Sequence, residues 1–340
     1  MNETNLNVLS LFDGVGSAYL ALKRAGLKIN NYYSSEIDPS ALAVLNYHYS
    51  GDSKFHQIGD IRNIDGLKYL DVDLVVFGSP CTQLSSVNSA DRSGLEGSDS
   101  KLFYDAIRIL KDLYAFQPAS KHLYFLMENV ASMTNQDRNR ITDELRFIFL
   151  DSVKMFKVNS ALVSGSNRRR YYWTNIPNVK IPKEKFVQYQ DLLVNGFVDR
   201  PKANVILSSQ LTLTNGISRY YNRNIGNIIF KDEKFVQLSV EDKLLLYPTI
   251  LKESNYVGKA KQLDDEYAFP NGAYRLPSVL ELERLMTFPD GYISNVPNLS
   301  KTQKKKLIGL SFTADVVAEL LSALGKVDEY LIKKFRKNCD

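Results

Sequence analysis

A lone cysteine after a turn-forming stretch is the most reactive side chain that the sequence offers. Leu74–Phe77 is a short apolar run that predicts a strand buried on both faces of a parallel sheet, and Gly78-Ser79-Pro80 follows it as a turn. Cys81 comes directly after this turn, and open α/β sheets bind their ligands beyond the carboxyl ends of the strands. A single cysteine often serves only as a small core hydrophobe. The loop position favours a nucleophile instead.

Further along the chain, a glutamate and a cluster of arginines also lie beside predicted strands. Glu128 follows a second predicted buried strand, Tyr124–Met127, and Arg168-Arg169-Arg170 forms a basic cluster. If Arg168 begins a strand that reaches Tyr172, then Arg168 and Arg170 share one face of it and Arg169 points away. Glu128 is then either a proton donor or a strand-end carboxylate paired with a nearby arginine.

A glycine-containing turn near the N-terminus predicts a cofactor cradle. Asp13-Gly14-Val15-Gly16 lies between a predicted strand, Val8–Phe12, and a predicted helix, Ala18–Ala25, whose first N–H groups would face a ligand. The full dinucleotide-binding fingerprint is absent. Glu36, at the end of a predicted strand Tyr32–Ser35, suits hydrogen bonds to ribose hydroxyls. A helix N-terminal carboxylate before Pro39 is the alternative role for Glu36.

Length and composition describe a globular protein rather than a membrane or disulfide-rich one. The chain has 340 residues, 44% of them hydrophobic, and a formal net charge of +5. It has neither a long apolar run nor a signal-peptide pattern, so we expect a cytoplasmic location. Its two cysteines, Cys81 and Cys339, predict neither a disulfide framework nor a metal site. Lys304-Lys305-Lys306 and the arginine cluster permit a polyanion partner, although a lysine run is commonly just a solvated face.

The elements that must position these residues alternate between strand and helix as far as Pro177. Further helices are predicted at Pro39–His48, Lys101–Tyr114 and about Arg138–Leu150, with strands near Ala161 and Tyr171. The rhythm is lost from Asn178 to Tyr274, where we expect a small irregular or β-rich domain, and helical periodicity returns at Ser278–Met286 and Thr313–Leu324. The sequence therefore predicts an α/β domain over 1–177, a second domain over 178–274 and a C-terminal segment over 275–340.

Five motifs, taken in order, resemble those of the DNA cytosine-5 methyltransferases. They are Phe12-Asp13-Gly14-Val15-Gly16, Gly78-Ser79-Pro80-Cys81, Glu128-Asn129-Val130, Arg168-Arg169-Arg170 and Gly309-Leu310-Ser311-Phe312. The resemblance is closest to the catalytic domain of the eukaryotic de novo branch and covers roughly Val8–Pro177 and Arg275–Leu324. It implies a doubly wound, Rossmann-like methyltransferase sheet dependent on S-adenosylmethionine, with a smaller target-recognition domain.

The resemblance also assigns catalytic roles in a DNA (cytosine-5-)-methyltransferase. Cys81 would add to carbon 6 of cytosine, because carbon 5 is a poor nucleophile until the ring is activated. Glu128 would then supply a proton at N3 and Arg170 would stabilise charge near O2. Arg168 is expected to be a partner of Glu128 or of the loop that carries Cys81.

The implied cofactor is S-adenosylmethionine, and no metal is implied. Glu36 would hold the ribose and Asp60 the adenine amino group. Ser311 and Phe312 would close the pocket, so the last helix would return to the first domain. The complete set of implied cofactor residues is Phe12, Asp13, Gly14, Gly16, Glu36, Ile37, Asp60, Ile61, Ser79, Pro80, Leu102, Ser311 and Phe312.

The implied partner is double-stranded DNA, from which the target base must be flipped out. The segment Asn88–Asp99 is expected to be a mobile loop that closes over this base. Ser85, Arg219 and Arg223 are the candidate DNA-binding residues. Gly216 aligns with an arginine through which the de novo branch reads guanine, so CpG specificity is not expected here.

Two other functions are weighed against this one. One branch of the family methylates RNA, but that branch has Pro-Pro-Cys where this chain has Ser79-Pro80-Cys81. A catalytically silent homologue should have lost the cysteine or the cofactor motif, and this chain retains both. Thr82, Ser166 and Leu310 depart from the commonest family pattern. We expect a stand-alone bacterial or phage enzyme, cytoplasmic and associated with the nucleoid. A cognate restriction endonuclease and the oligomeric state are left open. Phe103 and Tyr104 are either a self-association contact or helix core.

Overall fold

The computed structural model describes residues 5–80, 84, 93–97, 101–207, 213–246, 266–269 and 272–326. Cys81, Thr82, Ser85 and Cys339 lie outside these ranges, as does most of the segment Asn88–Asp99. The described chain divides into two compact units. The first comprises the residues up to Asn159, Arg169–Pro182 and the residues from Ala314 onward. The second comprises Ser160–Arg168 and Lys183–Thr313.

A seven-stranded sheet forms the centre of the first unit, in the order β3-β2-β1-β4-β5-β7-β6. Neighbouring strands from β3 to β5 are parallel, whereas β7 is antiparallel to both of its neighbours. The strand order reverses between β1 and β4, so the sheet is doubly wound with its switch point there. The strands are β1 (Leu6–Leu11), β2 (Ile29–Ser35), β3 (Phe55–Gln57), β4 (Leu74–Phe77), β5 (Tyr124–Val130), β6 (Lys154–Asn159) and β7 (Arg169–Thr174).

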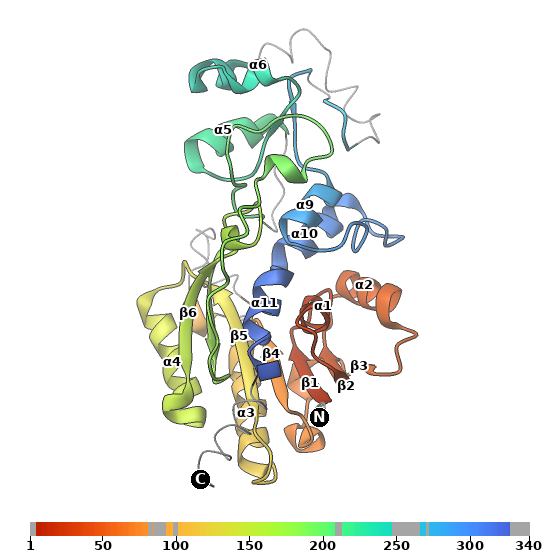
Figure 1. Ribbon diagram of the computed structural model, residues 1–340, viewed down its shortest axis with the longest axis vertical. Coiled ribbons are helices and arrows are strands. Elements are labelled where there is room, and N and C mark those ends of the chain that lie inside the picture. The colour runs from red at the N-terminus through yellow and green to blue at the C-terminus, as the bar shows by residue number, and fades with distance from the viewer. Residues whose placement is uncertain are drawn as a thin grey trace, which may run out of the picture. The chain divides into compact units, whose positions relative to one another are not determined.

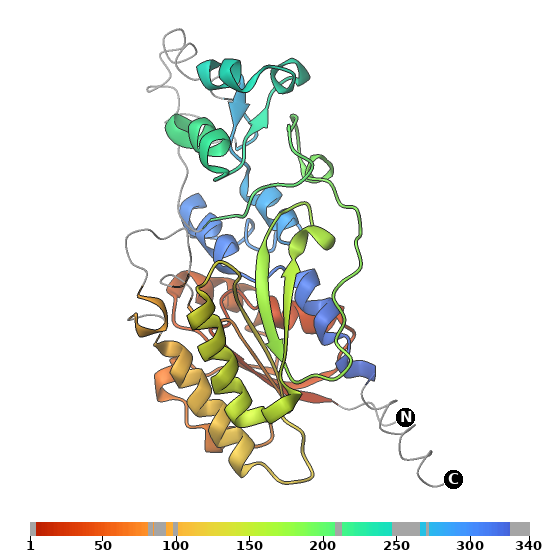
Figure 2. The same cartoon turned by 90° about the vertical axis from the view of Figure 1, so that its left-hand side faces the viewer.

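Helices cover both faces of this sheet (Figures 1 and 2). One face carries α1 (Ser17–Arg24), α2 (Pro39–Tyr49) and α11 (Ala314–Leu321), and the other carries α3 (Leu102–Phe116) and α4 (Asn135–Phe149). Alternate strand residues point toward α3 and α4 and form the main core. They include Leu9, Leu11, Val75, Phe77, Phe125, Met127 and Trp173. This architecture confirms the predicted α/β class, and α11 packs against α1 of the same unit.

Strand positions differ from the prediction in several places: β3 was not predicted, and β7 begins at Arg169 rather than at Arg168. The strand expected near Ala161 is wrong, because β6 ends at Asn159 and Ser160–Leu162 is a 3-10 turn. The amides of Val163 and Ser164 both donate to the carbonyl oxygen of Ser160, which closes this turn. The remaining short 3-10 helices are Ile61–Asn63, Gly66–Tyr69, Gly94–Glu96, Leu150–Ser152, Gln190–Leu192 and Leu324–Lys326.

The second unit contains little regular β-structure in its described part. A two-stranded sheet pairs β8 (Ile229–Phe230) with β9 (Tyr274–Arg275). Its described helices include α5 (Leu213–Arg223), α6 (Glu233–Val236), α9 (Val279–Leu285) and α10 (Lys301–Leu310), and residues 240–246 are also helical. A small core of Ile217, Tyr220, Ile228, Phe230, Ala273 and Tyr274 holds α5 against the sheet. Residues 275–313 group with this unit by their contacts, whereas the functional boundaries at 177/178 and 274/275 stay a prediction.

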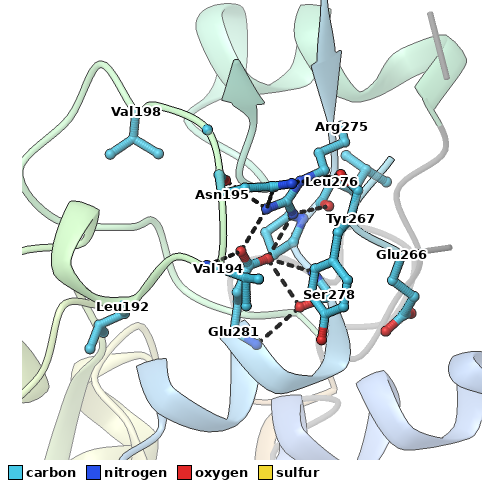
Figure 3. A network of polar contacts seen from close by, with 12 residues as sticks. Leu192, Val194, Asn195, Val198, Glu266, Tyr267, Arg275, Leu276, Ser278 and Glu281 are labelled. Carbon is cyan, nitrogen blue, oxygen red and sulfur yellow. Dashed lines mark hydrogen bonds and ion pairs between the residues drawn. The ribbon is translucent and has the colours of Figure 1, made fainter. Parts of the chain in front are cut away.

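A buried ion pair fixes the start of α9 in the second unit (Figure 3). The Arg275 guanidinium donates to both carboxylate oxygens of Glu281, at 2.6 and 2.7 Å, and to the side chain of Asn195. Burial is the largest single influence and would raise the pKa of Glu281, but the hydrogen bonds and charge of Arg275, together with the amides of Val194 and Ser278, outweigh it and hold that pKa below its usual range. Ser278 completes a capping box with Glu281. The pair therefore ties the loop at Asn195 to α9, and removal of one partner would leave a buried charge.

Candidate active site

The turn after β4 is held by an asparagine from the neighbouring strand. Asn129 is fully buried, and its Nδ2 donates to the Oγ of Ser79 at 3.0 Å and to the Ser79 carbonyl oxygen at 3.3 Å. Its Oδ1 accepts from the amide of Val130 at 2.7 Å. Because β4 and β5 are adjacent, with Phe77 opposite Met127, this side chain spans directly to the turn. Asn129 thus fixes the backbone just before Cys81, a role that the sequence analysis missed.

Glu128 and Arg170 form an ion pair at the end of β5. Arg170 Nε lies 2.9 Å from Glu128 Oε1, and only 12% of each side chain is exposed. The antiparallel register pairs Glu128 with Tyr172 and Val130 with Arg170, which puts both charged side chains on one face of the sheet. Arg169 is exposed, as the predicted alternation requires. The site therefore brings together the predicted acid and the predicted cation.

Arg168 contacts a different part of the molecule. It is 4% exposed, and its guanidinium donates to the carbonyl oxygens of Gly309, at 3.2 Å, and Ser311, at 2.8 Å. Arg170 forms the ion pair with Glu128, and the expected partnership of Arg168 with Glu128 or with the loop that carries Cys81 stays a prediction. A buried guanidinium that satisfies the carbonyl oxygens at the end of α10 positions the backbone. Its predicted catalytic role is untested by these contacts.

The glycine turn after β1 is organised by Glu36. Its Oε2 accepts from the Gly14 amide at 2.7 Å, and its Oε1 accepts from the amides of Ile37 and Asp38 at 2.7 and 2.8 Å. Gly14 and Gly16 have φ angles of 62° and 75°, which favour glycine. The side chain that caps α2 is Asp38, which accepts from the Ser40 amide. Asp38 is thus the N-cap of α2, while Glu36 is a carboxylate at the N-terminal side of the same helix, as the alternative expected, and its ribose contact stays a prediction.

Asp13 supports the turn from inside the protein. Its carboxylate accepts hydrogen bonds from the hydroxyls of Ser10, Tyr32 and Ser34, at 2.6 to 2.7 Å, and the residue is 3% exposed. Burial raises the pKa of Asp13 to about 6, although the three hydroxyls oppose this shift. We therefore assign the Asp13 side chain a structural part in shaping the turn.

Asp60 lies at the end of the next strand-to-helix turn. Its carboxylate accepts from the main-chain amide of Arg62 at 2.9 Å and from Arg62 Nε at 3.0 Å, and these bonds lower its pKa. Ile61 is buried, whereas 55% of Ile37 is exposed. Leu102 is half-buried at the first turn of α3. An ionised acid and an exposed aliphatic side chain thus stand on neighbouring loops of the first unit.

The predicted lid residues of the C-terminal segment belong to the second unit. Ser311 ends α10, donating through its Oγ to the Leu307 carbonyl oxygen at 2.7 Å, and is 6% exposed. Phe312 is 8% exposed. Their expected closure over the cofactor stays a prediction.

Helix α5 carries the candidate DNA-reading arginines. Arg223 is exposed and Arg219 is half-buried, and the Asn222 side chain bonds Ser218 one turn earlier at 3.2 Å. Gly216 faces inward, because a Cβ built on it would lie 3.3 Å from Leu276 and 3.5 Å from Ile228. An arginine at position 216 would point into the core of this unit.

Burial distinguishes the two interpretations of Phe103 and Tyr104. Phe103 is fully buried in the core of the first unit, and Tyr104 packs against that core, as the helix-core interpretation expected. In the lysine run, Lys304 donates to the Ser294 carbonyl oxygen and Lys305 to that of Pro277, so these side chains are bonded within the protein. Among the residues described, no cluster of three metal-ligating side chains occurs. No helix in the described ranges is long and apolar enough to cross a membrane.

Comparison with known proteins places these features in a family. A family model for the C-5 cytosine-specific DNA methylase matches residues 6–326. The chain is 36% identical over 123 residues to the DNA (cytosine-5)-methyltransferase DRM2 of Oryza sativa subsp. japonica, which covers 34% of this chain and 21% of that protein. It is 29% identical over 198 residues to the orphan methyltransferase M.SPRI of Bacillus phage SPR, covering 56% of this chain and 43% of that protein. The chain thus spans less than half the length of these curated relatives.

Solved structures share the fold across almost the whole chain. The methyltransferase EhMeth of Entamoeba histolytica superposes with a TM-score of 0.66 at 14% identity, covering 96% of this chain and 99% of that one. A DNMT2 mutant of Spodoptera frugiperda gives a TM-score of 0.60 at 19% identity, covering 94% and 99%. At such identities these two similarities concern the fold alone.

Proposed function

Since the chain belongs to the C-5 cytosine-specific DNA methylase family, we propose that it methylates carbon 5 of a flipped-out cytosine in double-stranded DNA. The methyl donor in this proposal is S-adenosylmethionine, and the reaction runs through a covalent adduct with Cys81. The observation that carries the proposal is the pair of Glu128 and Arg170 on β5 and β7. Glu128 lies on β5, the strand that also carries Asn129, whose side chain bonds the turn before Cys81.

The proposed chemistry needs three groups of this chain at the cytosine ring. The Cys81 thiolate adds to carbon 6, and the displaced electron pair is taken up at N3, where Glu128 delivers a proton. Carbon 5 would then become nucleophilic and take the methyl group, the carbon–sulfur bond of the donor breaking to leave a neutral thioether, while the proton at N3 returns to Glu128. Transfer of the carbon 5 proton to a water molecule would expel the thiolate and restore the ring. Arg170 keeps its positive charge throughout and both orients Glu128 and stabilises charge on the ring oxygen O2.

The residues around the glycine turn suit S-adenosylmethionine, which supplies an electrophilic methyl group when bound. No atom lies within 4 Å of a Cβ built on Gly14, so the backbone there is open to a close ligand. The Glu36 carboxylate can accept from ribose hydroxyls while it holds the Gly14 amide. The exposed Ile37 offers an aliphatic surface beside it, and Asp60 offers an acceptor for an amino group. These two acceptors and the aliphatic surface suit the hydroxyl groups, the amino group and the flat base of an adenosine.

Helix α5 supports duplex DNA as the substrate. Its sequence from Leu213 to Arg223 contains two arginines and no acidic residue. Arginine can position a protein on phosphates or read guanine directly in the major groove. A relative from Bacillus phage SPR is named an orphan methyltransferase, which supports action without a cognate restriction endonuclease.

The test uses methyl-labelled S-adenosylmethionine with duplex DNA and with tRNA as separate substrates. We expect label in DNA cytosine, located by bisulfite sequencing, and a stable adduct with a 5-fluorocytosine duplex, because fluorine blocks loss of the carbon 5 proton. Cys81→Ala should abolish labelling and the adduct, whereas the matched control Cys339→Ala should retain both. Label in RNA alone, or an adduct mapped to Cys339, would contradict the proposal.

A further inference from the structure

Residues 199–204 form a short segment of the second unit. The first half of this segment is hydrogen-bonded to helix α5. Asp199 Oδ1 accepts from the Tyr220 hydroxyl at 2.6 Å, its other oxygen accepts from the Tyr221 hydroxyl, and Lys243 lies 3.2 Å from that same oxygen. The Arg200 guanidinium stacks on the Tyr220 ring at 3.9 Å and donates to the Tyr220 carbonyl oxygen at 3.1 Å. Two consecutive tyrosines held in this way fix the rotation of α5 about its axis.

The second half of this segment is bonded to the stretch that leads into Arg168. Lys202 Nζ donates to three carbonyl oxygens, those of Ala161 at 2.8 Å, Ser164 at 3.0 Å and Val187 at 2.5 Å. These three bonds use the full donor capacity of an ammonium group. The Ala203 amide donates to the Gly165 carbonyl oxygen at 2.7 Å, and the Ala203 carbonyl oxygen accepts from the Asn167 amide at 2.8 Å. Residues 161–167 therefore depend on this segment for their placement.

Asn204 connects the two halves. Its Oδ1 accepts from Arg200 at 3.1 Å, and its Nδ2 donates to the Gly226 carbonyl oxygen at 2.9 Å, just beyond α5. Its main-chain amide and carbonyl oxygen both bond the side chain of the buried Asn227. The same carbonyl oxygen accepts from the Ser166 hydroxyl at 3.4 Å. One residue thus contacts the end of α5, the Arg200 stack and the approach to the arginine strand.

We propose that residues 199–204 act as a strap that couples DNA recognition by α5 to the placement of Arg170, with Asn204 as its central positioning residue. This inference rests on the proposed function. Arg168 is anchored to Gly309 and Ser311, and Arg170 follows it by two residues and pairs with Glu128. Any displacement of α5 on DNA reaches Asn167 through one contiguous run of hydrogen bonds, and then reaches Arg170 along the backbone. Through the strap, Arg170 takes its catalytic position only when α5 is bound to its target DNA sequence.

The test measures the single-turnover methylation rate and the equilibrium affinity for the same duplex separately. Coupling between sites typically changes a constant by about 5- to 150-fold, and we expect Asn204→Ala to lower the rate about tenfold. Affinity for DNA and for S-adenosylmethionine should change by less than about threefold, because Asn204 is assigned to neither ligand. Asn204→Asp retains the acceptor for Arg200 and should recover part of the rate. Gln237→Ala, an exposed residue of the same unit outside the strap, is the matched control and should resemble the wild type.

A double-mutant cycle with Arg223→Ala separates coupling from a general structural defect. If α5 acts through the strap, the combined rate loss should be smaller than the product of the two single losses. Multiplicative losses, an unchanged rate in Asn204→Ala, or equal losses of rate and DNA affinity would overturn the inference. A wild-type protein without methyltransferase activity would instead refute the proposed function, so the two failures are distinguishable. If thermal unfolding shows that Asn204→Ala does not fold, the cycle is run with Asn204→Asp and judged by the same criteria.

Discussion

Substitution of Asn129 by leucine tests the proposed link between the core of the first unit and its nucleophile. The change keeps the volume of the side chain but removes its three hydrogen bonds, to the Ser79 hydroxyl, the Ser79 carbonyl oxygen and the Val130 amide. All of these groups stand in a buried environment, since Asn129 is 0% exposed and Ser79 is 5% exposed. The turn before Cys81 would then lose the side chain that holds it to β5.

The expected magnitude follows from the groups left without partners. A buried donor or acceptor without a partner costs about 1–3 kcal/mol, so the Val130 amide and the Ser79 hydroxyl together cost about 2–6 kcal/mol. For a domain of this size that corresponds to a fall in Tm of about 4–24 °C. A displacement of a reacting group by about 1 Å can cost about 10²-fold in rate. We therefore expect a rate loss of that order, measured below the lowered Tm.

The assay follows adduct formation with a 5-fluorocytosine duplex alongside thermal unfolding and S-adenosylmethionine affinity. Asn129→Leu should slow the adduct and lower Tm while leaving cofactor affinity near the wild-type value. Ser79→Ala removes only the hydroxyl and should have a smaller effect on both. A variant that unfolds at a lower temperature but forms the adduct at the wild-type rate would refute the positioning role of Asn129.

Three further outcomes are expected from the site and from α5. Glu128→Gln should slow methyl transfer by about 10²–10⁴-fold with cofactor affinity retained, whereas Glu36→Ala should weaken cofactor binding; equal losses of binding in both variants would contradict this division of roles. Because burial raises the pKa of Asp13 from 3.8 to about 6, the folded protein holds this proton more tightly than the unfolded chain does. Stability should therefore fall by about 3 kcal/mol as pH rises from about 4 to about 6, and denaturant unfolding of Asp13→Asn should show a flatter pH dependence. Methylation of a randomised duplex library should show that Arg219→Ala or Arg223→Ala relaxes one position of the target sequence; unchanged sequence preference in both would exclude these arginines as base readers.

Strands with a strong apolar signal could be located from the sequence. Leu74–Phe77 was predicted with the bounds that the structure gives it, because four consecutive buried residues in a parallel sheet need no alternation. The β6 strand was misplaced, because Lys154–Asn159 lies at the sheet edge with mostly exposed side chains and carries little apolar pattern. The apolar residues Ala161 and Leu162 imitated a strand but belong to a turn of the second unit.

The site was predictable in residue type but not in pairing. Burial alternation from Arg168 to Arg170 follows from strand geometry, and the sequence therefore predicted which arginines face inward. Which of them meets Glu128 depends on the antiparallel register of β5 and β7, which the local sequence does not encode. Asn129 and the strap around Asn204 were missed for the same reason, because the groups that they connect to other elements lie 15 to 50 residues away along the chain.

The packing of α11 against α1 has a consequence for synthesis on the ribosome. Arg24 of α1 and Asp315 of α11 form an ion pair at 2.6 Å although 291 positions separate them in the chain. At translation speeds of about 5–20 residues per second, α11 emerges about 15–60 s after α1. During that interval the apolar face of α1 that α11 will cover is exposed, whereas the whole second unit, residues 160–168 and 183–313, has already been synthesised and can fold. The nascent chain therefore offers a binding surface for chaperones that disappears only when α11 docks, and the catalytic half of the molecule is the last to be completed.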